Sequence, residues 1–150
     1  MKLAWITDIH LNFVDFDTKQ KFYESLFVNA IDAIAISGDI DEALTLSNTL
    51  IEMTRHILKP IYFVLGNHDY YRGSVTGLRK EIKALCKKTS QLHWLPESKE
   101  IELTKSTALI GEDCWADGRY GDYASSQVVL NDSHMIKELY QGNKLGKYQL

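Results

Sequence analysis

Three short apolar runs, each ending in a cluster of polar residues, constrain the fold of this chain more than any other feature. The runs are KLAWIT, AIAIS and IYFVL, and DIH, GD and GNHD follow them. Each run is too short for a helix, and segments of helical length separate them. This alternation predicts βαβ units with right-handed crossovers, and therefore an α/β fold with a parallel or mixed β-sheet flanked by helices.

Both segments between the runs are predicted to be helical. The first helix extends to about residue 29, and Asp17 or Thr18 caps it. Its expected apolar face consists of Phe22, Leu26 and Phe27. The second helix covers residues 41–58, with acidic residues in its first turn and Pro60 after its end. Its expected apolar face consists of Leu44, Ile51 and Leu58.

The second half of the chain gives weaker signals. Residues 74–88 are predicted to form a helix that Ser74 caps, and a last helix is expected over residues 132–141 with Asp132 as its cap. Three short strands are expected at LHWL, EIEL and TALIG. The loop at residues 111–123 is rich in glycine, aspartate and aromatic residues.

Composition indicates one domain of 150 residues with a net charge of −3. No apolar segment reaches the roughly 20 residues that span a membrane, and the apolar start of the chain ends at Asp8, too early for a secretory signal. Cys86 and Cys114 lack the CxxC spacing of a zinc site, which favours a cytoplasmic protein. Without a long basic block, no generic nucleic-acid binding is expected, and no membrane partner.

Asp8 and His10 are the first candidate metal ligands. In an extended segment, residues two apart point to the same side, so a carboxylate and an imidazole converge. Mixed oxygen and nitrogen ligands suit a divalent metal. The alternative is that Asp8 begins a turn and His10 is a solvated loop residue.

Asp39 and Asn67 are the second pair of candidates. Gly38 allows a sharp turn that brings the Asp39 carboxylate toward a neighbouring strand end, where it could bridge two metals roughly 3.5 to 4 Å apart. Asn67 offers a neutral amide oxygen. Taken singly, Gly-Asp and GNHD are also ordinary turn sequences.

His68 and Asp69 exceed what a turn requires, which suggests a catalytic role. His68, as the neighbour of Asn67 in a turn, should point away from the metals and serve as a general acid or a cationic stabiliser. Asp69 is expected to orient the His68 ring.

Taken together, DxH, GD and GNHD at three strand ends resemble the motifs of the calcineurin-like metallophosphoesterases, over roughly the first half of the chain. The resemblance implies part of an αββα sandwich, with His68 as the catalytic histidine. It also implies one metal on Asp8, His10 and Asp39, and a second on Asp39 and Asn67. The implied cofactors are two divalent ions of manganese, iron or zinc, and the implied reaction is hydrolysis of a phosphomonoester or phosphodiester by a metal-bridging hydroxide.

The sequence departs from the family pattern in two respects. It lacks the arginine of the phosphoprotein phosphatases, reading GDIDEA and GNHD, so it looks more like the phosphodiesterase-type branches; Arg72 or Arg119 could contact phosphate instead. It also lacks the later histidine motifs, because His56, His93 and His134 fall in helical or strand-like contexts, where His134 is expected to be solvated. The chain is therefore interpreted as the N-terminal portion of such a domain, with the missing sheet supplied by a C-terminal part or another chain.

Functions of other classes are weighed against this reading. The absent histidines are consistent with a catalytically inactive scaffold or binding module on the same fold, although a scaffold has no need of His68. A nucleotide-binding domain or a serine hydrolase is not supported, since GxGxxG, GxxxxGK[ST] and GxSxG are all absent.

Overall fold

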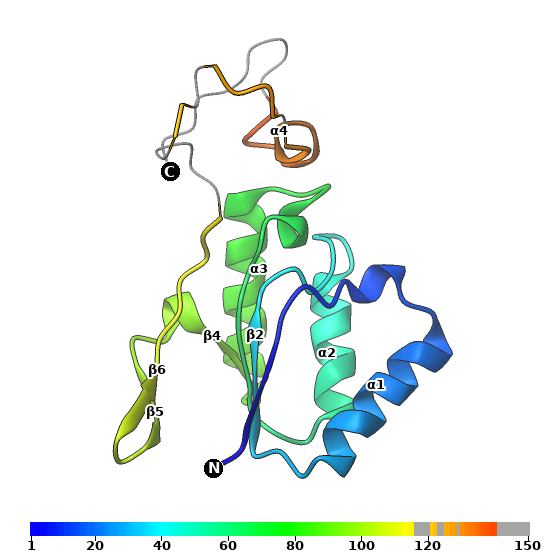
Figure 1. The fold of residues 1–150 in the computed structure, drawn as a ribbon, viewed down its shortest axis with the longest axis vertical. Coiled ribbons are helices and arrows are strands. Elements are labelled where there is room, and N and C mark those ends of the chain that lie inside the picture. Colours follow the sequence, from blue (N-terminus) through cyan, green and yellow to red (C-terminus); the bar gives the residue numbers. More distant parts are fainter. Residues whose placement is uncertain (116–120, 123–124, 129, 141–150) are drawn as a thin grey trace.

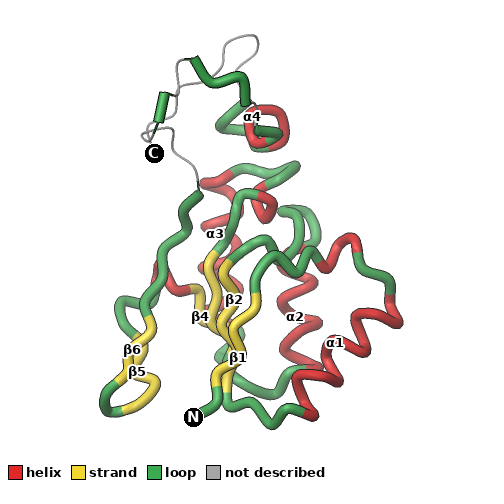
Figure 2. Tube along the Cα trace, in the orientation of Figure 1, coloured by secondary structure: helices red, strands yellow, loops and turns green. Residues whose placement is uncertain are grey.

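The central element of the molecule is a parallel four-stranded sheet. The computed structural model describes residues 1–115, 121–122, 125–128 and 130–140. The strand order is β1-β2-β3-β4, and every pairing in this sheet is parallel. The α/β fold predicted from the three apolar runs is confirmed, and helices α1 and α2 lie on one side of the sheet (Figure 2).

The elements follow one another in the predicted alternation. The sheet is built from β1 (Leu3–Ile6), β2 (Ala33–Ser37), β3 (Ile61–Val64) and β4 (Leu92–Trp94). Helices α1 (Phe16–Val28), α2 (Leu46–His56) and α3 (Val75–Lys88) connect these strands. An antiparallel hairpin follows, made of β5 (Ile101–Thr104) and β6 (Thr107–Leu109), and α4 (Asp132–Met135) is the last described helix.

The main core lies between the sheet and the three long helices. Ile34 and Ile36 of β2 and Ile61 and Phe63 of β3 are buried there, together with apolar residues of all three helices. The other face of the sheet has a smaller core, where Ala33, Tyr62 and Leu95 are buried against residues of the β5–β6 hairpin. Because β2 and β3 are covered on both faces, they are continuous apolar runs rather than alternating ones.

The edge strand β1 is covered on one face only. Ala4 and Ile6 pack against the main core, whereas Leu3 and Trp5 are 37% and 75% exposed. The hairpin lies on the far side of the sheet from α1 and α2 (Figure 1) and packs near β3, so it leaves this part of β1 open. The indole N–H of Trp5 donates a hydrogen bond to Ser37 Oγ at 3.0 Å, which is the one described polar contact of this side chain.

The start of helix α1 differs from the predicted one. Helix α1 begins at Phe16, and Asp15, rather than Asp17 or Thr18, caps it by accepting the Thr18 backbone N–H at 3.0 Å. The side chain of residue 27, placed on the apolar face by the sequence, lies outside the described side chains.

The predicted apolar face of α2 was wrong. Leu44 and Leu58 are 72% and 77% exposed, and the buried face consists of Leu46, Leu50 and Met53. Residues 41–45 form a turn instead of helix, because the Asp41 carboxylate accepts the backbone N–H of Glu42 at 2.7 Å and the hydroxyl of Thr45 at 2.6 Å. The helix therefore begins later, and a different set of residues faces the sheet.

The segment at residues 131–140 is docked on the corner between β3 and α3. Its backbone pairs with that corner twice, since Arg72 N–H donates to Met135 O at 2.7 Å and Lys137 N–H donates to Gly73 O at 2.9 Å. Ile136 is fully buried in the main core. The predicted ten-residue helix is wrong: α4 has four residues, and Asp132 lies inside it and bonds to the β3–α3 corner rather than capping.

Glu138 joins this docked segment to the start of α3, where Ser74 caps the helix as predicted. Its carboxylate accepts the Ser74 hydroxyl at 2.6 Å and the backbone N–H groups of Val75 and Thr76 at 2.8 and 3.0 Å. Partial burial opposes its ionisation, but these hydrogen bonds outweigh burial and lower the pKa of Glu138 to about 2 from the ordinary 4.5. The ionised form is thus the one that holds the segment.

Glu138→Gln is expected to destabilise the chain most at neutral pH. A depressed carboxyl pKa contributes stability above the unfolded value of 4.5, and that contribution is lost as the pH falls through about 2. Since the group is largely exposed, we expect a loss of about 0.5–1 kcal/mol at pH 7. Urea unfolding of both proteins between pH 7 and pH 3 measures it, and a difference that grows toward low pH would contradict this role.

Candidate metal centre

The three polar clusters follow the carboxyl ends of β1, β2 and β3, at the end of the sheet that is nearest to α4 (Figure 1). Beyond the strands, the first two loops remain paired. The N–H of Asp8 donates to Gly38 O at 3.2 Å, and the N–H of His10 donates to Asp39 O at 3.0 Å. Parallel pairing therefore extends into the loops and keeps the candidate ligands adjacent.

The backbone at Asp8 and His10 is left-handed, whereas the sequence predicted an extended segment. Asp8, His10 and Asp39 have φ values of 52°, 39° and 53°, and they are three of the five described non-glycine residues with positive φ. Such left-handed residues cost free energy and concentrate at functional sites. The two side chains converge as predicted, but through a left-handed loop instead of an extended one.

Asp8, His10 and Asp39 form a cluster whose candidate ligand atoms all lie within 4.8 Å of one another. It is the one group of three or more histidine, cysteine or acidic residues with such geometry among the described residues. His10 Nε2 lies 3.9 Å from Asp39 Oδ2, too far for a hydrogen bond. Two ligands each about 2.1 Å from one ion are separated by up to about 4.2 Å, so this spacing fits a shared cation.

A second observation supports the fit of a metal to this cluster. No described hydrogen bond occupies either ring nitrogen of His10, and Nδ1 is buried without a partner, so the imidazole is free to bind a cation through one of its nitrogens. Asp8 is exposed, so the cluster opens to solvent on that side. A carboxylate pair with one imidazole suits manganese, iron or zinc.

Two glycines allow Asp39 to reach its position. Gly38 has a φ of 94°, and a Cβ there would lie 2.7 Å from the Gly66 nitrogen. A Cβ on Gly66 would lie 2.1 Å from Asp39 Oδ1. The SGD and GNHD loops therefore touch through glycine backbone, and the Asp39 carboxylate occupies the space that a side chain at residue 66 would take.

His68 lies beside the cluster. Its backbone N–H donates to Asp39 Oδ1 at 3.1 Å, while its ring meets the His10 ring edge-on with centroids 4.7 Å apart. The opposite neighbour is Tyr71, whose ring stacks on His68 at 4.3 Å. The imidazole is half-buried, so a substrate at the cluster could reach it.

Asn67 is held by residues that the sequence did not link to the site. Its Nδ2 donates to Asp132 Oδ1 at 2.8 Å and to the Tyr71 hydroxyl at 3.3 Å. The Tyr71 hydroxyl in turn donates to Asp132 Oδ1 at 2.8 Å. Burial and the neighbouring Asp132 raise the pKa of Tyr71, so its hydroxyl stays protonated.

The Asp69 side chain does not contact the His68 ring, the partner predicted for it, through any described hydrogen bond. It is fully buried and accepts four backbone N–H groups, those of Asp39, Ile40, Asp41 and Gly66, at 2.8–3.0 Å. Burial raises the pKa of Asp69 to about 7, although the N–H groups act in the opposite direction. Asp69 therefore joins the two ligand loops rather than orienting the histidine.

Asp113 is a second buried carboxylate that the sequence did not single out. It accepts the Leu65 N–H at 2.7 Å, the Trp94 indole N–H at 3.0 Å and the Tyr70 hydroxyl at 2.9 Å, and Arg79 Nε lies 3.5 Å away. These contacts fix the start of the loop at residues 111–123 against the end of β3. Residues 116–120 and 123 of that loop, Arg119 included, lie outside the described residues.

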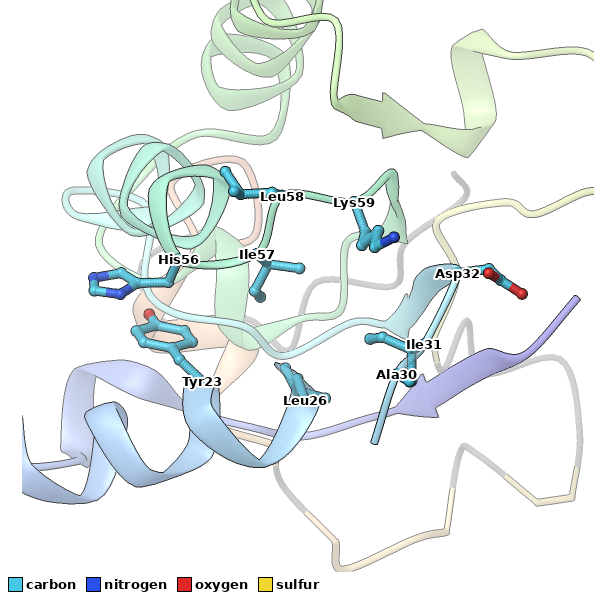
Figure 3. A pocket seen from close by; sticks show the side chains of 9 residues that line it. All are labelled: Tyr23, Leu26, Ala30, Ile31, Asp32, His56, Ile57, Leu58 and Lys59. Carbon is cyan, nitrogen blue, oxygen red and sulfur yellow. The ribbon is translucent and has the colours of Figure 1, made fainter. Parts of the chain in front are cut away.

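An apolar cavity lies away from this site. It has a volume of about 510 Å³ and lies near the amino ends of β2 and β3, with Tyr23 and His56 stacked 4.6 Å apart at one end (Figure 3). None of the predicted site residues lines it. Two further residues were considered from the sequence. His134 is exposed, as predicted. Arg72, a candidate phosphate contact, forms an ion pair in which its Nε lies 3.2 Å from Glu42 Oε2.

Comparison with known proteins agrees with this geometry. The family model described as calcineurin-like phosphoesterase matches residues 1–146. Neither the curated proteins nor the solved structures give a match. No described helix is long and apolar enough to cross a membrane. With a match over nearly the whole chain and three strand-end motifs in place, this chain belongs to the calcineurin-like phosphoesterase family, a family of metal-dependent phosphoesterase scaffolds.

Proposed function

We propose that this protein is a cytoplasmic hydrolase that cleaves a phosphomonoester or phosphodiester with two divalent cations. The observation that carries the proposal is the Asp8, His10 and Asp39 cluster at the carboxyl edge of the sheet, with His68 beside it. Residues with oxygen and imidazole donors would hold manganese, iron or zinc. A phosphate ester is the substrate class that the family implies.

Each residue of the site has a distinct task in this proposal. Asp8 and His10 would hold one cation with Asp39, and Asp39 would share the second with Asn67. Bound cations of this kind supply a nucleophile at neutral pH and offset negative charge on the phosphoryl oxygens. The chain's own residues fix the ligand positions through the loop pairing and the two glycine contacts.

His68 is the proposed proton donor. Its ring lies between the rings of His10 and Tyr71 and is half-buried, which restricts its motion while leaving it open to a substrate. A positioned imidazole that protonates the leaving oxygen accelerates such reactions by about 10²–10⁴-fold.

A non-catalytic scaffold is the second candidate. The observation that favours it is the open face of β1, where Leu3 and Trp5 form an apolar surface at the edge of the sheet. In the hydrolase, this face would receive the rest of the sandwich, from the same chain or another. In a scaffold, it would receive a protein partner, and the metal ligands would have no chemical role.

Hydrolysis of bis-p-nitrophenyl phosphate and p-nitrophenyl phosphate with Mn²⁺ tests the proposal. We expect turnover that EDTA abolishes and Mn²⁺ restores. Asp8→Asn should lower it at least about 10-fold by weakening the cation site, since ligand changes commonly cost that much. Asp15→Asn is the matched control, because this exposed carboxylate caps α1 away from the cluster.

Metal binding without turnover of either substrate would favour the scaffold. Absence of both binding and turnover would contradict the proposed function. Turnover that is equal in both asparagine variants would show that the cluster is not the site.

A further inference from the structure

Asp132 is the described residue most distant in sequence that touches a candidate ligand side chain. It follows Asn67 by 65 residues, yet its Oδ1 atom accepts hydrogen bonds from Asn67 Nδ2 and from the Tyr71 hydroxyl, each at 2.8 Å. The Asp132 side chain is buried, with 5% of the residue exposed. A buried carboxylate with two donors on one oxygen is a specific arrangement rather than a surface contact.

These contacts determine which way the Asn67 amide faces. An ionised carboxylate only accepts hydrogen bonds, so the Asn67 atom that lies 2.8 Å from it must be the nitrogen. The same nitrogen lies 3.3 Å from the Tyr71 hydroxyl oxygen. Because both contacts use the nitrogen, Oδ1 is left as the Asn67 side-chain atom without a described hydrogen bond.

The position of Asp132 is itself well determined. The backbone bonds of Arg72 to Met135 and of Lys137 to Gly73 lie just beyond it in the chain, and Ile136 is fully buried in the core. Glycine at residue 73 lets the corner that receives this segment pack against Ala43, since a Cβ there would lie 2.4 Å from the Ala43 Cβ. A fixed carboxylate can impose one orientation on a side-chain amide, whereas a mobile one cannot.

We propose that Asp132 is a positioning residue, which with the Tyr71 hydroxyl holds the Asn67 amide so that its oxygen is available to a divalent cation. The inference rests on the proposed function for the role of that cation. Outer partners that orient a ligand usually contribute 10–100-fold to metal affinity. Asp132 does not touch substrate or metal, and it acts through Asn67.

The hydrogen bond itself can be tested in the metal-free protein. We expect one side-chain amide proton of Asn67, assigned by its loss in Asn67→Asp, to resonate downfield of exposed asparagines and to exchange at least about 10-fold more slowly. Asp132→Ala should remove both properties, and Lys137→Gln, an exposed position on the same docked segment, should keep them. If the Asn67 side-chain amide protons of the unaltered protein exchange as fast as those of an exposed asparagine, that result alone overturns the proposal.

Titration of Mn²⁺ into the metal-free protein tests the consequence. Asp132→Ala should weaken binding by 10–100-fold. Asp132→Asn retains an oxygen that can accept both bonds, so its affinity should stay within about threefold, and that of the control Lys137→Gln should stay within about twofold. Unchanged affinity in Asp132→Ala, or equal losses in Asp132→Ala and Asp132→Asn, would overturn the positioning role.

The two measurements separate this inference from the proposed function. A protein that binds no Mn²⁺ contradicts the proposed function, while the amide protons of Asn67 still decide the orientation. If the protein binds Mn²⁺ and hydrolyses substrate normally, but Asp132→Ala leaves the Asn67 amide protons unchanged, the proposed function stands and this inference alone is overturned.

Discussion

His68→Ala is expected to lower phosphodiester turnover by about 10²–10⁴-fold while the protein retains its Mn²⁺. The ring of His68 contacts His10 and Tyr71, but its bond to the cluster is made by the backbone N–H, which alanine keeps. Loss of the ring therefore removes the proposed proton donor and leaves the candidate ligands in place. Single-turnover rates and Mn²⁺ titration of the same preparation measure the two quantities separately.

Asp39→Asn is the contrasting variant. It replaces the anion nearest to both proposed cation positions by a neutral amide, and it should weaken Mn²⁺ binding much more than His68→Ala does. Equal loss of metal in the two variants would contradict the assigned roles. Equal turnover in His68→Ala and the unaltered protein would remove His68 from the reaction.

Asp69→Ala is expected to lower the free energy of unfolding by about 4 kcal/mol or more. The substitution leaves four backbone N–H groups without their acceptor in a fully buried position, and each such group costs about 1–3 kcal/mol. Domains of this size have only about 5–15 kcal/mol in total, so a large share of the stability should be lost. Urea unfolding followed by circular dichroism gives the value.

Glu24→Ala is the matched control for that experiment. Glu24 is an exposed acidic residue on α1, and its replacement should change stability by less than about 0.5 kcal/mol. A loss below about 1 kcal/mol in Asp69→Ala would contradict the view that this carboxylate ties the two ligand loops together.

The features that could be predicted from sequence are those that depend on neighbouring residues. Apolar runs with polar ends defined the strands, and the parallel sheet then brought Asp8, His10 and Asp39 to one edge as expected. Their left-handed backbone was not expected, because no local signal distinguishes a strained aspartate from an extended one. The catalytic and ligand roles stay predictions.

The features that were missed depend on contacts between distant segments. The start of α2 is decided by side-chain bonds of Asp41, which compete with the helix that apolar spacing indicated. Asp69 took four backbone partners, mostly from a loop about 30 residues earlier. Asp132 resembles a helix cap in sequence, and only the docking of its segment reveals its bond to Asn67.

Residues 131–140 are docked by two backbone bonds, by side-chain bonds of Asp132 and Glu138, and by two buried apolar residues, Ile136 and Leu139, and so small a contact implies uneven stability within the molecule. Such a segment can open by itself, at a lower free energy than unfolding of the whole domain. In the opened form the sheet and the Asp8, His10 and Asp39 cluster would persist, but Asn67 would rotate freely. Heat or denaturant should therefore weaken Mn²⁺ binding by local opening of this segment, before the far-ultraviolet circular dichroism signal reports any loss of structure.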